Sequence, residues 1–274
     1  MKNVHIITGG SSGIGLECAK SFKDGIVLIT GRREQKLIEA VEELKSAGIE
    51  ADFKQGDISS AKSIKELFEY ASSLGNIKTL VNSAGVSGIG VDAKLTFEID
   101  LVGSENLVLG AKEYLKEGAV VILISSMMGH TVEPNPDRDR LLENPSEVGA
   151  IDQLVQMAQN DSSLAYNFSK RGVQLLVKKY AEEFGKKGVR IVSISPGIIM
   201  TDMAAKAAEE HPEQMNYMKM MTPAQRNGKP EDIVGAVEYL SSDKASFITG
   251  TDLLVDGGLT LRLPEIMAAY ANQE

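Results

Sequence analysis

The chain has 274 residues, of which 43% are hydrophobic and 24% charged, values ordinary for a folded protein with a substantial core. Its formal net charge of −9, without a basic stripe, argues against nucleic acid as a partner. A single cysteine, Cys18, excludes an internal disulfide, and three well-separated histidines argue against a metal site.

The apolar runs are all short, and the longest, such as residues 119–124, are strand-sized and far below the length of a membrane span. The first predicted strand begins almost at the first residue, which leaves no room for a signal peptide. We therefore expect a cytoplasmic protein with no membrane partner. Cys18 falls in the first predicted helix, where a small buried apolar role is expected.

Apolar, β-branched runs alternate with segments of helical period along nearly the whole chain. Several runs are apolar on both faces, which is typical of strands covered by helices on each side. The pattern predicts an α/β fold, a doubly wound parallel sheet of about seven strands, in a single domain over residues 1–274. The predicted strands are Val4–Thr8, Ile26–Thr30, Glu50–Gln55, Thr79–Asn82, Ala119–Ser125, Arg190–Ser195 and Asp252–Val255, and the helices include Glu34–Ala47, Ser63–Ser73, Leu95–Leu115, Leu164–Gly185 and Pro230–Ser241.

Two segments interrupt this alternation, and both follow the carboxyl end of a strand, the edge where open α/β sheets bind ligands. Residues 131–161, approximately, form a predicted helical insertion, with an amphipathic helix around Glu147–Gln159. Residues 200–226, approximately, form a predicted substrate loop, which holds six of the eleven methionines.

The stretch TGGSSGIG, residues 8–15, lies between the first strand and a helix that begins near Ile14. This arrangement points backbone N–H groups and a helix N-terminus at phosphate. We expect Gly9 to permit the turn, Gly13 to let a pyrophosphate approach, and Gly15 to let the helix pack on the strand. Ser11 and Ser12 are expected to add hydroxyl donors and a helix cap. Taken alone, the loop could also be an ordinary strand-to-helix turn.

Further motifs follow the glycine loop in order, and they are Asn82-Ser83-Ala84-Gly85, Ser126, Tyr166-x-x-x-Lys170, Pro196-Gly197-x-x-x-Thr201 and Val255-Asp256-Gly257-Gly258. The ordered set resembles the motifs of the short-chain dehydrogenase/reductase family and covers nearly the whole chain. The resemblance implies a Rossmann-like sheet, a nicotinamide cofactor, and an oxidoreductase that interconverts a ketone and a secondary alcohol.

The end of the second strand bears on the choice of cofactor. NAD-binding folds carry a carboxylate there, whereas this chain has Gly31 followed by Arg32 and Arg33. Guanidinium groups attract a 2′-phosphate, so NADP(H) is predicted; NAD remains possible if the arginines only solvate a helix start. The implied cofactor-binding residues are Thr8, Gly9, Ser11, Ser12, Gly13, Ile14, Gly15, Arg32, Arg33, Asp57, Ile58, Asn82, Ser83, Ala84, Gly85, Tyr166, Lys170, Pro196, Gly197, Ile199 and Thr201.

Tyr166 and Lys170 are four positions apart in a predicted helix and so share a face. A nearby ammonium stabilises a phenolate, which helps a phenol exchange protons. By the resemblance, Tyr166 exchanges a proton with the substrate oxygen, Ser126 hydrogen-bonds that oxygen, and Lys170 holds the nicotinamide ribose. Asp100 stands where the family usually has an asparagine, and we expect it to be tolerated there as the fourth member of the catalytic set.

Ser126 and Tyr166 are separated by a much longer segment than is usual in the family. The insertion and its frame resemble the branch of bacterial 3α-hydroxysteroid dehydrogenase/carbonyl reductases. The insertion caps the substrate cleft, alters the subunit contact, or is a tolerated surface loop. Altered assembly is favoured, with a homodimer or homotetramer expected.

Methionines next to Ser126 suit a broad apolar binding surface, although they could equally fill a core. They favour a bulky hydrophobic ketone or alcohol, such as a steroid or bile acid. The alternatives are a 3-oxoacyl or small-carbonyl reductase, and a non-catalytic NADP(H)-sensing regulator, which only Asp100 supports. The predicted substrate-binding residues are Ser126, Met127, Met128, Tyr166, Met200 and Met203.

Overall fold

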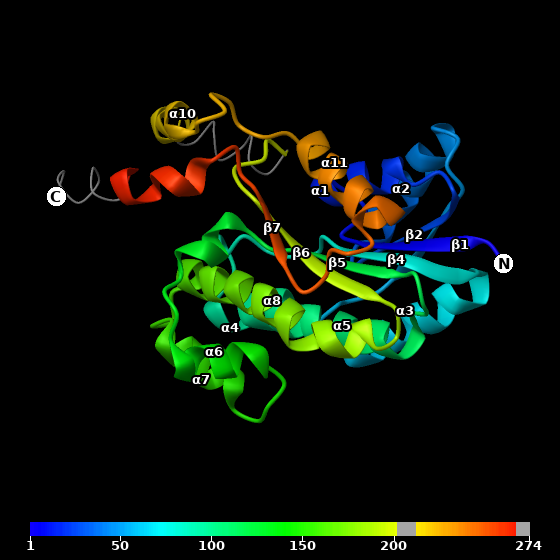
Figure 1. The fold of residues 1–274 in the computed structure, drawn as a ribbon, viewed down its shortest axis with the longest axis horizontal. Coiled ribbons are helices and arrows are strands. Elements are labelled where there is room, and N and C mark those ends of the chain that lie inside the picture. The colour runs from blue at the N-terminus through cyan, green and yellow to red at the C-terminus, as the bar shows by residue number, and fades with distance from the viewer. Residues whose placement is uncertain (202–211, 267–274) are drawn as a thin grey trace.

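The computed structural model describes residues 1–201 and 212–266. In this part of the chain, seven strands form one parallel sheet in the order β3-β2-β1-β4-β5-β6-β7 (Figure 1). The predicted Rossmann-like fold with a doubly wound parallel sheet is confirmed. The strands are β1 (Asn3–Thr8), β2 (Gly25–Gly31), β3 (Ala51–Gln55), β4 (Asn76–Asn82), β5 (Val120–Ile124), β6 (Arg190–Pro196) and β7 (Asp252–Val255).

The strand order changes direction between β1 and β4, because β2 and β3 extend to one side and β4 to β7 to the other. At such a switch point the crossover helices leave on opposite faces and a crevice opens at the carboxyl ends of the strands. The neighbouring residues Ile6 and Ile7 of β1 are both fully buried, as expected for a central strand covered on both faces.

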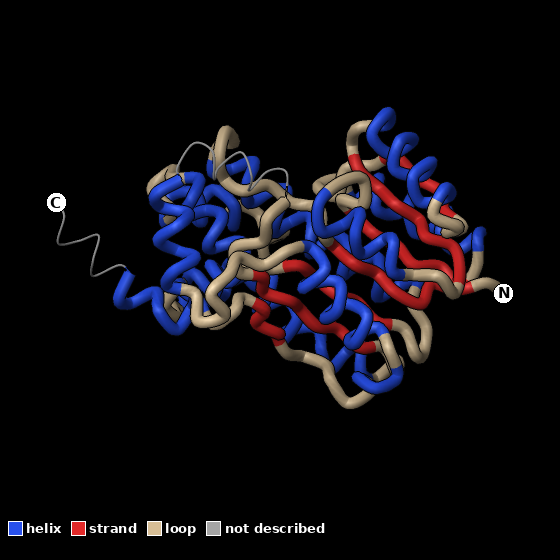
Figure 2. Tube along the Cα trace, turned by 90° about the horizontal axis from the view of Figure 1, so that it is seen from above, coloured by secondary structure: helices blue, strands red, loops and turns tan. Residues whose placement is uncertain are grey.

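Helices cover both faces of the sheet (Figures 1 and 2). On one face lie α1 (Gly13–Ser21), α2 (Glu34–Ser46) and α11 (Pro230–Ser241), and on the other lie α3 (Ala61–Leu74), α5 (Gly103–Tyr114) and α8 (Ser162–Gly185). In α2 the buried residues Leu37, Ala40, Val41 and Leu44 recur at helical spacing, which gives one apolar stripe. Cys18 of α1 is fully buried, and burial raises the pKa of its thiol to about 12.

The helix predicted over Leu95–Leu115 is divided into three parts: α4 (Ala93–Phe97), the π-helical segment η1 (Glu98–Val102) and α5. Apolar periodicity predicts a helix but does not reveal a local change in hydrogen-bond register. Such π turns are rare and often mark functional positions. Asp100 lies in the middle of this segment and is buried.

The insertion contains two helices, α6 (Pro136–Glu143) and α7 (Ala150–Met157). Helix α7 corresponds to the helix predicted around Glu147–Gln159 but starts later, because Gly149 has a left-handed φ of 79°. Helix α6 was not predicted, although Asn135 caps it by accepting from the Arg138 amide at 2.9 Å. The prolines of this segment favour a loop by composition, yet Pro136 occupies the first turn, where proline is tolerated.

The insertion packs against α4 and α8, on the side away from the sheet (Figure 1). Its loop is held by Glu105 of α5, which accepts a hydrogen bond from the Ser146 hydroxyl at 2.6 Å. The remaining elements are η2 (Met127–Thr131), α10 (Pro212–Met221), η3 (Asp243–Ala245) and η4 (Leu259–Arg262). Within the described residues, every helix is too short or too polar to cross a bilayer.

Candidate active site

A cleft of about 570 Å³ opens at the carboxyl ends of the strands. It runs from the glycine loop to the start of α8, so motifs far apart in the sequence share one cavity. The predicted site residues that line it are Gly9, Ser11, Ser12, Gly13, Ile14, Arg32, Arg33, Asp57, Ile58, Ser83, Ala84, Gly85, Ser126, Tyr166, Lys170, Pro196, Gly197, Ile199 and Thr201.

Three predicted cofactor residues, Thr8, Gly15 and Asn82, lie behind the lining rather than in it. The Thr8 hydroxyl donates to Asn82 Oδ1 at 2.5 Å and accepts from the Ala84 amide at 3.1 Å. A side chain at Gly15 would collide with the carbonyl oxygen of Gly9. These three residues therefore support the shape of the cleft, while the residues next to them in the sequence line it.

The glycine loop has the geometry of an anion-binding turn. Gly9 and Gly13 have φ values of +64° and +53°, a region that residues with a side chain rarely adopt. Helix α1 begins at Gly13 beside the cleft, so its first N–H groups are available to a phosphate. Ser12 occupies the N-cap position, but its hydroxyl makes no capping hydrogen bond. Ser12 thus stands at the predicted cap position, but its side chain does not supply the expected cap.

Arg32 and Arg33 are exposed at the end of β2 and line the cleft. The Arg32 carbonyl accepts from Gln55 Nε2 at 2.8 Å, which ties this turn to β3. At the next strand, Asp57 Oδ1 accepts from the amide and hydroxyl of Ser59 at 2.9 and 2.8 Å. Two guanidinium groups and one fixed carboxylate thus stand at the same end of the cleft.

Ser126, Tyr166 and Lys170 meet at the other end of the cleft. The Lys170 ammonium nitrogen lies 5.3 Å from the centre of the Tyr166 ring. The Ser125 hydroxyl donates to the Lys170 carbonyl at 2.8 Å and so fixes β5 to α8. Ser126 is the N-cap of η2, and its hydroxyl oxygen accepts from the Met128 amide at 3.2 Å.

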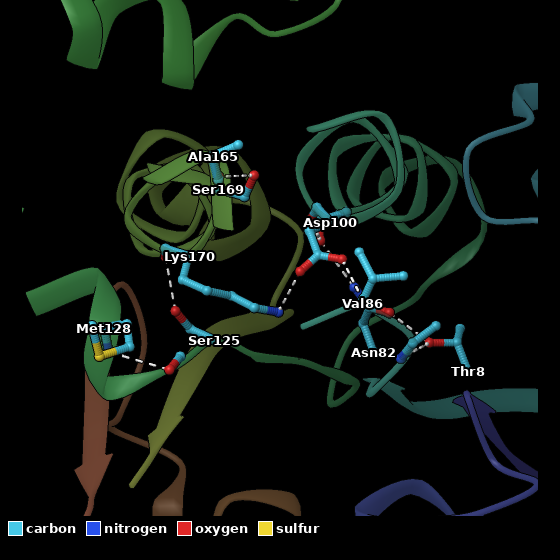
Figure 3. A network of polar contacts seen from close by, with 12 residues as sticks. Thr8, Asn82, Val86, Asp100, Ser125, Met128, Ala165, Ser169 and Lys170 are labelled. Atoms are coloured by element: carbon cyan, nitrogen blue, oxygen red, sulfur yellow. Dashed lines mark hydrogen bonds and ion pairs between the residues drawn. The ribbon is translucent and has the colours of Figure 1, made fainter. Parts of the chain in front are cut away.

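Asp100 and Lys170 form a buried ion pair (Figure 3). Asp100 Oδ2 lies 3.1 Å from the Lys170 nitrogen, at ion-pair distance. Oδ1 accepts from the Val86 amide at 2.8 Å. A Cβ on Gly85 would lie 3.1 Å from Asp100 Oδ1 and 3.4 Å from the Lys170 nitrogen, so Gly85 leaves room for the pair.

The charges of this pair are strongly influenced by burial. Burial raises the pKa of the Asp100 carboxyl, against the opposing effects of the Lys170 charge and the Val86 N–H. Burial alone would lower the pKa of Lys170, but the facing Asp100 and Tyr166 outweigh it and raise that pKa. Lys170 therefore stays a cation in the cleft.

A chain of hydrogen bonds connects the ion pair to the glycine loop, and Figure 3 shows the part of it between Asn82 and Thr8. The Ser104 hydroxyl donates to the Asp100 carbonyl at 2.6 Å and accepts from Asn82 Nδ2 at 3.0 Å, and Asn82 in turn contacts Thr8. Sequence reasoning missed Ser104. The signal available was a small hydroxyl residue four positions after Asp100, where it can bond back to the preceding turn.

The predicted substrate residues are more dispersed. Met127 is buried with Leu259 in a small apolar cluster against which Met128 packs, and neither methionine lines the cleft. Met200 also lies outside the lining, with its sulfur 3.4 Å from Asn227 Nδ2, and Met203 falls outside the described residues.

Sequence reasoning also missed part of the lining. The missed residues are neighbours of motif residues at strand ends, or lie on the loop after Gly85 and on η1. They are Thr30, Gly31, Gly56, Val86, Ser87, Ile99, Ile124 and Ser125. The signal for most of them was position alone, since the carboxyl ends of parallel strands converge on one edge.

Comparisons with known proteins agree with the motifs. A family model described as "short chain dehydrogenase" matches residues 3–136, and one described as "Enoyl-(Acyl carrier protein) reductase" matches residues 141–260. Glucose 1-dehydrogenase of Gluconobacter oxydans is 30% identical over 268 residues, covering 93% of this chain and 91% of that protein. The 3-oxoacyl-[acyl-carrier-protein] reductase FabG of Staphylococcus aureus is 27% identical, covering 93% of this chain and 96% of its own length.

A solved short-chain type dehydrogenase/reductase from Mycobacterium ulcerans superposes with a TM-score of 0.78 at 26% identity, over 94% of this chain and 90% of that one. The chain belongs to the short-chain dehydrogenase/reductase family. It is thereby placed among oxidoreductases that act on CH–OH groups with a nicotinamide cofactor.

Proposed function

We propose that this protein is an NADP(H)-dependent oxidoreductase that interconverts a ketone and a secondary alcohol. The observation that carries the proposal is the convergence of Ser126, Tyr166 and Lys170 on one cleft with the glycine loop. The proposed substrate is a bulky hydrophobic carbonyl compound or alcohol, such as a steroid or bile acid. It is supported by the partly buried Met218 and Met221, which pack with Met127 beside the loop after β6.

The residues present fit a dinucleotide. The glycine loop and the first amides of α1 would hold the pyrophosphate, and Arg32 and Arg33 the 2′-phosphate of NADP. Asp57 and Ile58 border the proposed adenine end, and Lys170 the ribose beside the nicotinamide. When bound, this cofactor supplies or accepts the hydride of the reaction.

The side chains at the other end of the cleft carry out the proton transfer. In reduction the Tyr166 hydroxyl donates its proton to the carbonyl oxygen, and in oxidation the phenolate takes a proton from the alcohol. The Lys170 ammonium stabilises the phenolate through charge. The Ser126 oxygen already accepts from the Met128 amide, which leaves its O–H to donate to the substrate oxygen. The Asp100 carboxylate, 3.1 Å away, holds the Lys170 ammonium in place.

A screen of NADPH oxidation against steroid ketones, bile-acid ketones, small ketones and 3-oxoacyl thioesters tests this function. Turnover of the first two classes supports it. Preferred turnover of the thioesters would instead support a 3-oxoacyl reductase, which the similarity to the staphylococcal enzyme favours. Tyr166→Phe should abolish turnover while NADPH still binds. Binding without turnover in the unmodified protein would identify a cofactor-sensing regulator.

For assembly we propose a homodimer, formed by a single domain that spans residues 1–274. The insertion supports this, because α6 and α7 lie over α4 and α8 and cover a helical surface that would otherwise be open to a second subunit (Figure 1). The insertion contributes apolar side chains to this contact, with Leu141, Leu142 and Leu154 buried in the core cluster that also holds Phe168 of α8. Light scattering should give the mass of two chains, and a clean tetramer would contradict the proposal.

A further inference from the structure

A second polar network joins η2 to the edge of the sheet. His130, near the end of η2, contacts Asp252 of β7, with Nε2 2.8 Å from Oδ2. The other carboxylate oxygen accepts from the hydroxyls of Ser193 and Ser195 on β6, at 2.6 and 2.9 Å. The Asp252 side chain is only 9% exposed and both serines are fully buried. Three side chains from two elements thus hold this carboxylate in place.

The hydrogen bonds of this network have one consistent direction. Gln174 of α8 donates through Nε2 to the Ser195 oxygen at 3.0 Å, so the Ser195 hydrogen is free to donate to Asp252. A carboxylate accepts and does not donate, so the hydrogen shared with His130 lies on its Nε2. Both oxygens of Asp252 thus have a donor, and His130 is held against one of them.

The opposite end of η2 is Ser126. The Ser126 carbonyl accepts from the Gly129 amide at 3.0 Å, so serine and histidine belong to the same short turn. Gly129 lies against α8, where a Cβ would come within 2.6 Å of Gln174 Nε2 and 2.9 Å of the Arg171 amide. A single 3₁₀ turn has little rigidity of its own, so its orientation depends on what holds its two ends.

We propose that the His130–Asp252 pair is a positioning contact that fixes the orientation of η2 and thereby directs the Ser126 hydroxyl into the cleft. This rests on the proposed function, in which Ser126 binds the substrate oxygen. His130 does not line the cleft and acts only through the turn it shares with Ser126. Displacing a catalytic group by about 1 Å can slow a reaction by about a hundredfold, so the contact has a measurable effect on rate.

His130→Leu removes the donor to Asp252 while keeping a side chain of similar size. We expect kcat to fall by about 10-fold to 100-fold, while KM and the Kd for NADPH change by less than about twofold. His130→Gln keeps an N–H that can reach Asp252 and should restore most of kcat. Asp24→Asn is the matched control, because it alters the His5–Asp24 pair, 3.0 Å apart and distant from the cleft. It should leave kcat unchanged.

Two further measurements separate positioning from general stability. In a Ser126→Ala background, His130→Leu should lower the residual kcat by less than about twofold, because its effect passes through Ser126. Equal losses in both backgrounds would overturn the proposal. Hydrogen–deuterium exchange tests it without any substrate: residues 126–131 should exchange faster in His130→Leu, with β4 unchanged. Unaltered exchange in 126–131 would overturn it as well. Full activity in Tyr166→Phe would instead count against the proposed function.

Discussion

Replacing Asp100 by asparagine tests the buried ion pair directly. The change removes a negative charge and leaves one acceptor oxygen for two partners, the Val86 amide at 2.8 Å and the Lys170 ammonium at 3.1 Å. At 3.1 Å and an effective dielectric constant of about 20, the lost attraction is about 5 kcal/mol before desolvation is counted. Removing one partner of a buried pair typically costs about 3–5 kcal/mol, because the other charge stays buried.

We therefore expect Asp100→Asn to lower the free energy of unfolding by about 3 kcal/mol or more, measured by urea denaturation at neutral pH. Activity should remain within about tenfold of the unmodified protein, because Tyr166 and Lys170 stay adjacent on α8. The alkaline behaviour should change too. The pKa of Lys170 is raised above its ordinary 10.5, so its stabilising effect is complete below 10.5 and lost as pH rises through the higher folded value. In Asp100→Asn, the loss of stability as pH rises through this range should be smaller.

Asp139→Asn is a suitable control for this experiment, since it disrupts the pair between Asp139 of the insertion and Arg171 of α8, neither of which lines the cleft. Unchanged stability in Asp100→Asn would refute the reasoning from charge. Loss of all turnover, with folding and NADPH binding intact, would show that the carboxylate has a specific part in the reaction rather than a supporting one.

Two other predictions follow from charged groups at the surface. Arg32→Asp should lower kcat/KM with NADP(H) by about 10-fold or more and raise the preference for NAD(H), because a carboxylate repels the 2′-phosphate. Steady-state kinetics with both cofactors on one substrate check this prediction. A strong preference for NAD in the unmodified protein would contradict it. The Arg226 guanidinium, 2.6 and 2.7 Å from Asp232, lowers the pKa of that carboxyl from 3.8 to about 2. The pair therefore stabilises the fold above pH 3.8, and its effect is lost as pH falls towards about 2. Asp232→Asn should cost about 1 kcal/mol after solvent screening and flatten this acid dependence in thermal melts.

The strands and the order of the motifs could be read from the sequence because each depends on local pattern. Residues 120–124, for example, form a continuous apolar run and residues 4–8 a largely apolar one. Both are strands in a parallel sheet covered on both faces. Gly9 and Gly13, which were expected to permit the turn and the approach of a pyrophosphate, both have positive φ values. In each case, one short segment held the information.

The structural features that could not be predicted from the sequence depend on contacts between distant segments. The π turn around Asp100 and its pairing with Lys170 require the packing of η1 against α8. Helix α6 is polar and begins with a proline, so its burial at Leu141 and Leu142 is determined by α8 and not by its own periodicity. Met127 and Met128 were predicted to bind substrate from their adjacency to Ser126, and their packing with Leu259, far along the chain, could not be read from that adjacency.

The state of Cys18 has a practical consequence. Its thiol is fully buried in the packing of α1, with a pKa of about 12, so at neutral pH it is neither accessible nor in the reactive thiolate form. It is the only cysteine in the chain. A cysteine introduced at an exposed position, such as Ile89 on the loop beyond Gly85, would therefore be the single site for maleimide attachment. A fluorophore placed there could report ligand entry in the otherwise unmodified protein.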